Sequence, residues 1–324
     1  MDVLSGAVPE TAEGVEAAWT TLFFVIPVVS TTFASFDRLF SHLGRESLGW
    51  LLIDEAGQAA PQVAAGAIWR AKRSVVVGDP LQLEPVITIP FTVQQALRRY
   101  YQVDETWLPG STSVQQLTDR VSLLGTYLNG PEHSIWVGSP LRVHRRCDQP
   151  MFAISNKVAY DGLMVFGTPP RQAIALPPSS WMHVESPESE GHWIPAEGKA
   201  VETLIHDLIH QGVSADDIFL ISPFRVVVRR LRQIASRFHI KVGTVHTVQG
   251  KESDVVVLVL GGDPRRPRAK QWASARPNLL NVAASRAKRR LYVVGNQETW
   301  EQYPYFSVCS AILKQWNVAG SITT

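Results

Sequence analysis

The chain has 324 residues, of which 45% are hydrophobic and 19% charged, and 31 basic against 29 acidic side chains give a net charge of +2. This length predicts two domains or one large one, and the ordinary globular mixture excludes wholesale disorder. The near-neutral charge neither requires nor excludes a nucleic-acid partner. Two cysteines, Cys147 and Cys309, cannot form a disulfide framework or a four-cysteine zinc site, and they suit a reducing compartment.

No segment is predicted to cross a membrane or to direct export. The longest apolar run, residues 22–29 (LFFVIPVV), is much shorter than the ~20 residues that span a bilayer, and it contains Pro27. The N-terminal stretch MDVLSGAVPETAEG lacks a basic segment ahead of an apolar core, so it is not a signal peptide. The expected location is therefore the cytoplasm.

Short apolar runs recur along the chain, and each is typical of a strand. Several are apolar at consecutive positions, which indicates strands buried on both faces of a parallel sheet. The runs are residues 22–29, 50–54, 74–79, 217–222, 241–245, 254–260 and 291–295. Apolar side chains recur at helical spacing in residues 200–212 and 225–238, between these runs. This alternation predicts an α/β fold.

A polar, turn-rich stretch covers residues 104–134 and is typical of a linker. We therefore place a domain boundary near residue 130. Residues 1–129 then form an incomplete sheet domain, and residues 130–324 form a complete one. No internal repeat at the period of a solenoid protein is visible.

Two adjacent acids, Asp54 and Glu55, directly follow the apolar residues 51–53 of a predicted strand. They lie at the edge where open α/β sheets bind ligands. One carboxylate there can hold Mg²⁺, and the next can orient or deprotonate an attacking water. Taken alone, the pair is better explained as a cap for the following helix.

A second polar segment, GDPLQLEP at residues 78–85, also follows an apolar run. Gln82 within it could sense a γ-phosphate or a polarised water, as amide side chains do in nucleotide sites. Gly-Asp-Pro by itself indicates only a turn. The occurrence of both segments together is more specific than either one.

Three segments in the second half combine cations with small or polar residues. They are LRVHRRCDQP (141–150), VHTVQGKESD (245–254) and LLNVAASRAKRR (279–290). The adjacent Arg145 and Arg146 can stack on a planar ring and grip a phosphate, Gly250 allows close approach of the backbone to a ligand, and Arg286 ends a helix of small residues. The alternative interpretations are a solvated basic loop, a polar turn, and cations at a favourable helix C-terminus.

These segments resemble, in order, motifs II, III, IIIa, V and VI of superfamily 1 helicases. They are most similar to the Upf-one-like and Dna-two-like branch of RNA and DNA helicases. PVVSTTFAS (27–35) and LISPFRVVVRRL (220–231) resemble motifs Ic and IV of that branch, so the similarity covers residues 27–296. The resemblance implies two RecA-like parallel-sheet domains, the first incomplete, with ATP held between them.

The resemblance also implies a role for each matching acid, amide and arginine. Asp54 would hold Mg²⁺, Glu55 would act on the attacking water, and Gln82 would contact the γ-phosphate. Arg146 and Arg286 would reach the same phosphate as arginine fingers.

Four further positions are implied to contact the nucleotide. Gly250, Lys251 and Glu252 match the motif V residues near the γ-phosphate and ribose. Arg145 stands where relatives often carry an aromatic residue. A guanidinium can replace an aromatic ring, and the sequence leaves open whether Arg145 stacks on adenine.

Contacts to single-stranded nucleic acid are implied at the ends of strands in both halves. The matching residues are Ser30, Thr31, Thr32, Pro223, Phe224, Thr244, His246 and Thr247. Family helicases follow the backbone of a single strand, which makes binding tolerant of base sequence. The alternatives are ordinary strand-end residues, a buried core histidine at His246, and a merely solvated basic loop at residues 265–270.

One family element has no counterpart in this sequence. A phosphate-binding loop needs G-x-x-x-x-G-K-[ST], but the two Gly-Lys pairs, at residues 198–199 and 250–251, are followed by Ala200 and Glu252. The chain is therefore expected to be the C-terminal part of a longer helicase, with the N-terminal remainder of that protein as a partner, or a natural truncation. Without the loop, most binding of the β- and γ-phosphates is lost.

Two functions remain open from the sequence. The first is the motor part of an ATP-dependent helicase or translocase that uses ATP and Mg²⁺ on single-stranded DNA or RNA. The second is a non-catalytic helicase module that binds nucleic acid or a protein without turnover. An unrelated α/β hydrolase is excluded, because no G-x-S-x-G elbow precedes a helix.

Overall fold

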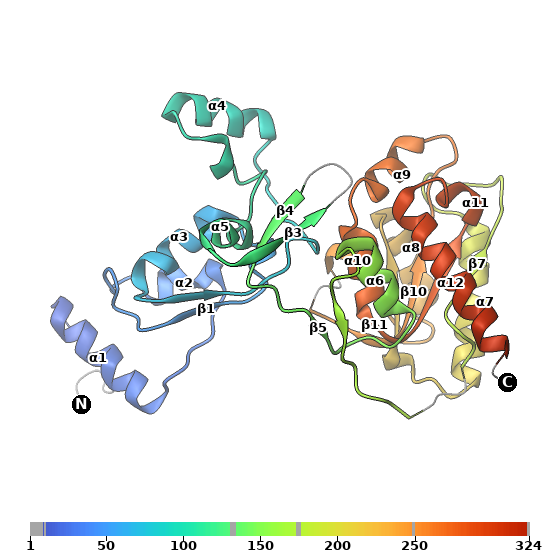
Figure 1. Cartoon of the computed structure of the whole chain (residues 1–324), viewed down its shortest axis with the longest axis horizontal. Helices are drawn as coiled ribbons and strands as arrows, with labels where there is room; N and C mark the ends of the chain where they lie inside the picture. The colour runs from blue at the N-terminus through green and yellow to red at the C-terminus, as the bar shows by residue number, and fades with distance from the viewer. Residues whose placement is uncertain (1–8, 10, 130–133, 173–175, 248–249, 323–324) are drawn as a thin grey trace. The chain divides into compact units, whose positions relative to one another are not determined.

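The computed structural model describes residue 9 and residues 11–129, 134–172, 176–247 and 250–322 (Figure 1). The chain forms two compact units. Unit 1 comprises Met1–Pro80, Glu84–Thr126 and Trp136–Ser139, and unit 2 comprises Leu81–Leu83, Tyr127–Ile135 and Pro140–Thr324. The short segment Leu81–Leu83 thus groups with unit 2. The division into RecA-like domains at residues 129 and 130 stays a prediction.

Unit 2 is built on a five-stranded sheet in the order β7-β11-β10-β8-β9, and its neighbouring strands are parallel. The strands are β7 (Ser180–His183), β8 (Ile218–Ser222), β9 (Lys241–Thr244), β10 (Ser253–Val259) and β11 (Ala287–Gly295). Every residue of β8 is buried, as is every residue of β10 except Asp254. Helices cover both faces of the sheet, so a strand with apolar residues at consecutive positions is buried on both sides. The predicted α/β fold with a parallel sheet is confirmed.

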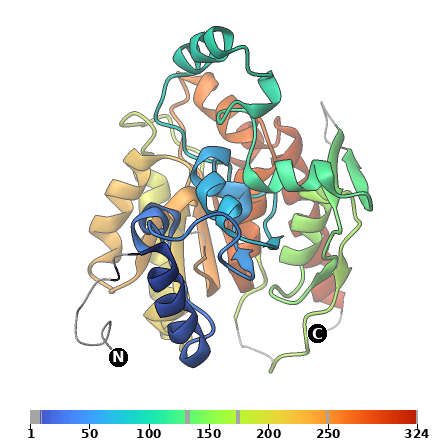
Figure 2. The same cartoon turned by 90° about the vertical axis from the view of Figure 1, so that its left-hand side faces the viewer.

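The helices of unit 2 form two layers around the sheet. They are α6 (Met151–Ala159), α7 (Pro195–His210), α8 (Arg225–Ala235), α9 (Pro267–Ser274), α10 (Asn278–Arg286), α11 (Gln297–Trp300) and α12 (Pro304–Ile322). In Figure 2 the yellow and light-orange α7 and α8 lie on one side of the strands, and the green α6 and red α12 lie on the other. Right-handed crossovers place α7 and α8 on one face and α10 on the other, because β7-α7-β8 and β8-α8-β9 advance across the sheet in one direction while β10-α10-β11 returns. The helices α6 and α12 share the face of α10, because α6 packs against both α10 and α12.

Shorter elements complete unit 2, and one small sheet has residues in both units. The strands β5 (Val143–His144) and β6 (Val165–Phe166) pair in parallel, and β3 (Gly125–Asn129) with β4 (Ser134–Gly138) forms another two-stranded sheet. The 3-10 helices η4 (Ala215–Asp217) and η5 (Val245–Thr247) precede β8 and follow β9. Each fully buried aliphatic side chain of the main sheet contributes about 1.5–3 kcal/mol, so this core dominates the stability of unit 2.

Unit 1 has a much thinner sheet, in which β1 (Leu51–Ile53) pairs in parallel with β2 (Ser74–Val76). Its helices are α1 (Ala12–Val25), α2 (Phe33–Leu39), α3 (Pro61–Arg70), α4 (Phe91–Tyr101) and α5 (Val114–Val121), with 3-10 helices η2 (Ala56–Gln58) and η3 (Glu105–Trp107). Two small apolar clusters, one around Phe36 and Phe40 and the other around Ile53, form its core.

One predicted strand is wrong. Residues 22–29 do not form a strand, because α1 extends from Ala12 to Val25 and ends inside the apolar run. The Thr11 side chain accepts a hydrogen bond from the Gly14 amide and caps the start of this helix. Phe23 packs partly against the Phe36 cluster, but the other residues of the run are exposed, whereas a strand inside a sheet would be buried. In the described part of the chain, no helix combines the length and apolarity needed to cross a bilayer.

Candidate nucleotide site and nucleic-acid interface

The acidic pair lies at the C-terminal end of β1, as the sequence predicts. Asp54 is exposed and its Oδ1 accepts a hydrogen bond from the Glu55 amide at 2.8 Å. Glu55 is half-buried, adopts a left-handed φ of 53°, and its Oε2 accepts from Gln58 Nε2 at 3.3 Å. A non-glycine residue in this conformation is strained, and such residues concentrate at functional sites. The two carboxylates therefore stand in a defined turn at the strand end.

The start of the GDPLQLEP segment lies beside this turn within unit 1. The Ala56 amide donates to the Val77 carbonyl at 3.0 Å, and the Val77 amide donates to Ile53 O at 2.8 Å. A side chain at Gly57 would place its Cβ 2.5 Å from the Asp79 carbonyl oxygen, so glycine is required for this close approach. The fold thus brings the motif II turn against the first residues of motif III.

Gln82 and Arg286 are brought together in unit 2. Arg286 Nη2 donates to Gln82 Oε1 at 2.9 Å, and the Arg286 side chain is almost fully buried at the end of α10. Two asparagines of α10 also hold the backbone of the segment that carries Gln82. Asn281 Nδ2 donates to Leu81 O at 2.9 Å, and Asn278 Nδ2 donates to Gln82 O. The two side chains predicted to contact the γ-phosphate, Gln82 and Arg286, are therefore hydrogen-bonded to each other at the end of α10.

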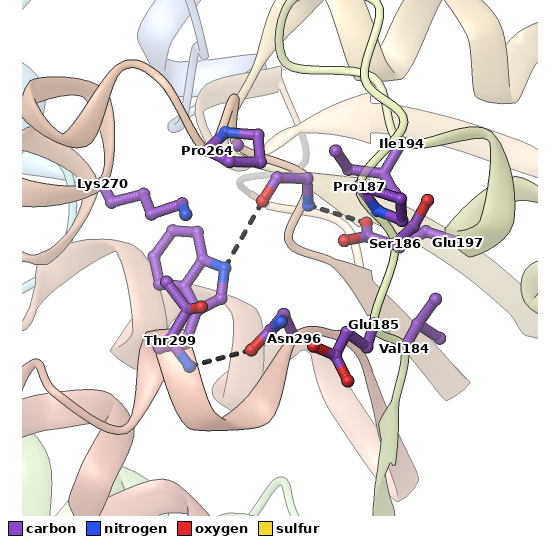
Figure 3. Close-up of a pocket in the computed structure, with 13 residues that line it drawn as sticks. Val184, Glu185, Ser186, Pro187, Ile194, Glu197, Pro264, Lys270, Asn296 and Thr299 are labelled. Carbon is purple, nitrogen blue, oxygen red and sulfur yellow. Dashed lines mark hydrogen bonds between the residues drawn. The ribbon is translucent and has the colours of Figure 1, made fainter.

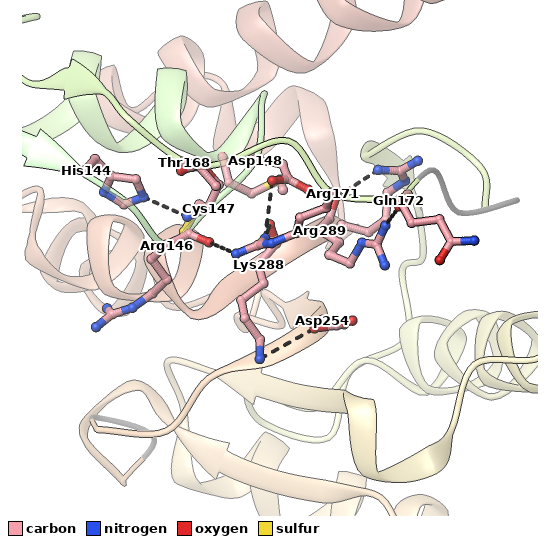
Figure 4. A network of polar contacts seen from close by, with 12 residues as sticks. His144, Arg146, Cys147, Asp148, Thr168, Arg171, Gln172, Asp254, Lys288 and Arg289 are labelled. Carbon is pink, nitrogen blue, oxygen red and sulfur yellow. Dashed lines mark hydrogen bonds and ion pairs between the residues drawn. The ribbon is translucent and has the colours of Figure 1, made fainter.

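Arg146 belongs to a network of charges that joins motifs IIIa, V and VI, of which Figure 4 shows the Lys288–Asp254 pair. Its Nε lies 3.0 Å from Glu252 Oε2. The Lys288 ammonium lies 3.5 Å from Glu252 Oε1 and 3.5 Å from Asp254 Oδ1. These side chains are roughly a third to two fifths exposed, so each pair adds little stability. What the network does is fix the direction in which the Arg146 guanidinium points.

Arg171, which was not predicted from the sequence, donates hydrogen bonds to both segments of this network. Its Nη2 donates to the Arg146 carbonyl at 2.8 Å, and its Nη1 donates to Asp148 Oδ1 at 3.2 Å and to Lys288 O at 3.1 Å. The Asp148 amide also donates to Lys288 O at 2.8 Å. Figure 4 shows Arg171 between the two segments. One guanidinium therefore joins the segment that carries Arg146 to the strand that follows Arg286.

The turn that presents Arg145 and Arg146 has a half-buried histidine and a buried thiol at its base. His144 Nε2 accepts a hydrogen bond from the Cys147 amide at 2.8 Å, and burial lowers the pKa of His144. The Cys147 thiol donates to Ser285 O at 3.4 Å, which ties the turn to α10. Burial also raises the pKa of Cys147 to about 12. Arg145 is exposed on this turn.

The motif V loop is only partly described. Val248 and Gln249 of the predicted motif lie outside the described residues. Gly250 is exposed with a φ of 73°, and nothing lies within 4 Å of the position a Cβ would occupy. Lys251 is exposed, and Glu252 carries the contacts to Arg146 and Lys288. Gly250 therefore leaves open space in a backbone conformation that other residues adopt with strain.

The predicted nucleic-acid contacts of unit 2 gather at one sheet edge. β8 and β9 are parallel with Ser222 opposite Thr244, so Pro223 and Phe224 follow one strand end and His246 and Thr247 follow the neighbouring one. Thr247 Oγ1 donates to the Thr244 carbonyl at 3.1 Å. In unit 1 the hydroxyl residues Ser30, Thr31 and Thr32 are exposed just before α2.

Phe224 differs from the other candidates because it is buried, with 7% of its surface exposed. Its ring stacks on His192 with a centroid distance of 4.4 Å and an interplanar angle of 16°. His192 Nδ1 in turn accepts the Asp263 amide at 3.2 Å. The ring therefore presents little surface to a ligand in this conformation.

A pocket of about 430 Å³ lies at the C-terminal ends of β7, β10 and β11 (Figure 3). Glu197 and Lys270 line it, and the Gly261 amide donates to Glu197 Oε2 at 2.8 Å. Burial raises the pKa of Glu197 to about 8 and lowers the pKa of Lys270. The sequence analysis missed this carboxyl. The Gly261-Gly262 pair, one residue beyond the end of β10, is the signal that marks a close backbone approach there.

Magnesium binding depends on a single candidate ligand. Among the described residues, no group of three or more His, Cys, Asp or Glu side chains gathers in a way that could hold a metal ion. Mg²⁺ bound with a nucleotide needs only one or two carboxylates besides phosphate oxygens and water. The exposed carboxylate of Asp54 fits that requirement, and its role stays a prediction.

Comparison with known proteins supports the family suggested by these motifs. A family model described as an AAA domain, AAA_12, matches residues 139–298, and a second AAA domain model, AAA_11, matches residues 13–89. Together they cover more than two thirds of the chain. The chain belongs to the superfamily 1 helicases of the Upf-one-like and Dna-two-like branch, as the resemblance predicted.

Curated relatives carry helicase names. The chain is 22% identical over 284 residues to the DNA replication ATP-dependent helicase/nuclease JHS1 of Arabidopsis thaliana, which covers 78% of this chain and 19% of that protein. It is 23% identical over 287 residues to the DNA-binding protein SMUBP-2 of Rattus norvegicus, covering 86% of this chain and 28% of that protein. The chain thus spans 19% and 28% of the length of these two curated relatives.

A shorter match is closer in sequence. The DNA polymerase alpha-associated DNA helicase A of Schizosaccharomyces pombe is 32% identical over 112 residues, covering 33% of this chain and 16% of that protein. Among solved structures, the helicase of PRRSV aligns with a TM-score of 0.39 and 16% identity over 78% of this chain and 37% of that chain. The family assignment rests on the sequence matches.

Proposed function

We propose that this chain is the C-terminal motor part of an ATP-dependent superfamily 1 helicase or translocase that acts on single-stranded nucleic acid. The observation that carries the proposal is the group of cations in unit 2. There Arg286 contacts Gln82, and Arg146 is held by Glu252, on elements that match motifs III, IIIa, V and VI. The names of the matched relatives favour DNA over RNA as the nucleic acid.

In this proposal the residues of the chain divide the hydrolysis of ATP between them. Asp54 would hold Mg²⁺, which supplies charge neutralisation at the phosphates when it is bound. Glu55 orients and deprotonates the attacking water, and its fixed turn keeps the carboxylate at the strand end. Arg146 and Arg286 stabilise the charge that develops on the γ-phosphate.

The contact between Arg146 and Glu252 has a consequence for this mechanism. Glu252 is the expected ribose contact, yet its carboxylate is paired with two cations in the structure. A ribose hydroxyl would compete with Arg146 for Glu252, and an anionic phosphate would attract the released guanidinium. We therefore expect nucleotide binding to exchange partners at Glu252 as Arg146 turns toward the phosphate.

The second candidate function is a non-catalytic module, which the lack of a phosphate-binding motif in this sequence favours. The sequence contains no G-x-x-x-x-G-K-[ST], so phosphate binding by such a loop would have to come from another segment. Leu52 in β1 is also 69% exposed, an unusual state for a strand of a parallel sheet, and Trp50 just before β1 is 62% exposed. We propose that the N-terminal remainder of the parent protein supplies both the phosphate-binding loop and the segment that covers β1 and β2.

Steady-state ATPase measurements separate the two candidates. We expect purified residues 1–324 to show negligible turnover with or without single strands, whereas a natural form that includes a phosphate-binding loop is active. In that form Glu55→Gln should abolish turnover and keep ATP binding. Arg286→Ala should slow hydrolysis by on the order of 10³-fold or more.

Arg237→Ala is the matched control, because Arg237 is an exposed arginine after α8 whose salt bridge to Glu202 involves none of the residues assigned to the site. Its turnover should equal that of the unaltered protein. Near-normal kcat in the Glu55 or Arg286 variant would contradict the role of that residue. Nucleic-acid-stimulated turnover by residues 1–324 alone, at a rate typical of helicases, would contradict the need for a further segment.

A further inference from the structure

The exposed face of α9, together with the loop before it, combines an aromatic ring with arginines. Trp272 has 58% of its surface exposed, although large aromatic side chains are usually well covered. Arg268 lies one helical turn earlier, so both side chains share a face of α9, and both are exposed. The opposite face is anchored, because Lys270, Ala273 and Ser274 are buried. This face is called the α9 platform below.

The segment that carries the α9 platform, residues 264–276, has charged side chains of one sign only. Residues 264–276 (PRRPRAKQWASAR) contain four arginines and one lysine but no acidic residue. Arg265 and Arg266 are exposed in the loop that leads into the helix. Local excess of this kind attracts phosphates even though the whole chain carries a net charge of only +2.

The platform is held in place by buried groups beneath it. Asp263, only 7% exposed, accepts the Arg265 amide at 2.9 Å, and its carboxylate lies 3.6 Å from Arg266 Nε. The Asp263 amide donates to His192, whose ring stacks on Phe224. Phe224 is in turn 6.4 Å from the Trp272 ring, centroid to centroid. The aromatic series thus runs from the end of β8 to the surface, and Trp272 is its exposed member.

We propose that Trp272 is a stacking surface for a base of single-stranded nucleic acid, with Arg265 and Arg268 holding the adjacent phosphates. The inference rests on the proposed function and extends it, because it assigns the base contact to Trp272 and gives Phe224 the part of a buried support. An indole accepts any base on its face, and arginines follow the backbone, so binding at this site is tolerant of sequence. Neither Trp272 nor Arg268 belongs to a helicase motif that the sequence analysis identified.

An anisotropy titration with two labelled strands of equal length tests this, one an oligothymidylate and the other an abasic strand. Trp272→Ala should weaken binding of the thymidine strand by about 5- to 150-fold, the usual cost of losing one stacked base. It should leave binding of the abasic strand unchanged. Trp272→Phe should restore most of the affinity, since a ring remains. Arg265→Ala and Arg268→Ala should each lower the salt slope by about 0.7 on both strands.

Trp316→Ala is the control for loss of an exposed tryptophan, because Trp316 lies on α12 and is 40% exposed. It should bind both strands like the unaltered chain. If the unaltered chain binds the thymidine strand and Trp272→Ala binds it equally well, or loses equally on both strands, the stacking role is wrong. If the unaltered chain binds neither strand at any salt concentration, the proposed function itself fails.

Discussion

The strands of the two units differ in how well they are covered. In unit 2 all of β8 and all but one residue of β10 are buried, whereas in unit 1 only one residue of β1 and none of β2 is buried. All of these strands are parallel and apolar in sequence. An apolar sequence is therefore not enough to bury a parallel strand, because burial depends on the helices packed against it. Unit 1 therefore carries its acidic pair on a thin support.

The largest expected effect of this difference is on core stability. Leu220→Ala in β8 should lower the free energy of unfolding of unit 2 by about 2–5 kcal/mol, because the side chain is fully buried and leaves a cavity. The matched change Leu52→Ala in β1 should stay within about ±0.5 kcal/mol, because that side chain already contacts water. Urea denaturation checks both. A Leu52→Ala cost equal to that of Leu220→Ala would mean that β1 is covered in solution.

The next effect is a pH dependence confined to unit 2. Burial raises the pKa of Glu197 from 4.5 to about 8, so the folded protein keeps a proton that the unfolded chain releases between these values. The stability that protonated Glu197 contributes is therefore fully present below about pH 4.5 and is lost as the pH rises through 8. The loss should be on the order of a few kcal/mol, at about 1.36 kcal/mol per pKa unit.

Thermal unfolding at several pH values measures this dependence. Glu197→Gln can still accept the hydrogen bond from the Gly261 amide, and it should remove most of the decline between pH 5 and 8. The reference is Glu202→Gln on the same helix, since Glu202 lies nearer the surface beside Arg237 and should keep the decline. Identical pH profiles for Glu197→Gln and the unaltered chain would show that Glu197 is ionised when buried.

The smallest expected effect is at the surface of unit 1. Asp37 is 75% exposed and lies 3.4 Å from Arg70, so Asp37→Asn should cost less than about 0.5 kcal/mol. Arg70→Ala should cost more, because Arg70 also donates to Leu43 O and Gly66 O, at 3.0 Å each, and joins two segments of the unit. Equal costs for the two variants in urea denaturation would assign the stability to the ion pair instead.

Sequence patterns predicted the parts of the fold that local chemistry determines. β8 and β10 were predicted because consecutive apolar residues indicate burial on both faces. Residues 22–29 show the limit of that signal, since an apolar run becomes a strand only when other strands and helices cover it. Here Thr11 begins a helix that extends into the run. The apolar run by itself does not decide whether it becomes a strand or part of a helix.

The candidate site was predictable by residue type but not by contact. Gln82 and Arg286 were both singled out, yet their hydrogen bond joins residues 204 positions apart. Arg171 was missed because it acts through the backbone carbonyls of Arg146 and Lys288, which every sequence contains. Glu197 was missed because an acid in the first turn of a helix is usually a solvated, dipole-favoured residue. Only tertiary packing turns it into a buried carboxyl.

The two cysteines give the chain a natural reporter of opening. Cys147 and Cys309 are both fully buried in unit 2, and burial raises the pKa of each thiol to about 12. Alkylating reagents attack the thiolate, so neither sulfur can be labelled while the packing between the Arg146 turn and α10, or around α12, is intact. Unit 1 has no cysteine at all. Labelling kinetics on the unaltered chain would therefore time the loosening of unit 2 alone, and Cys147 would time the release of the turn that carries Arg146.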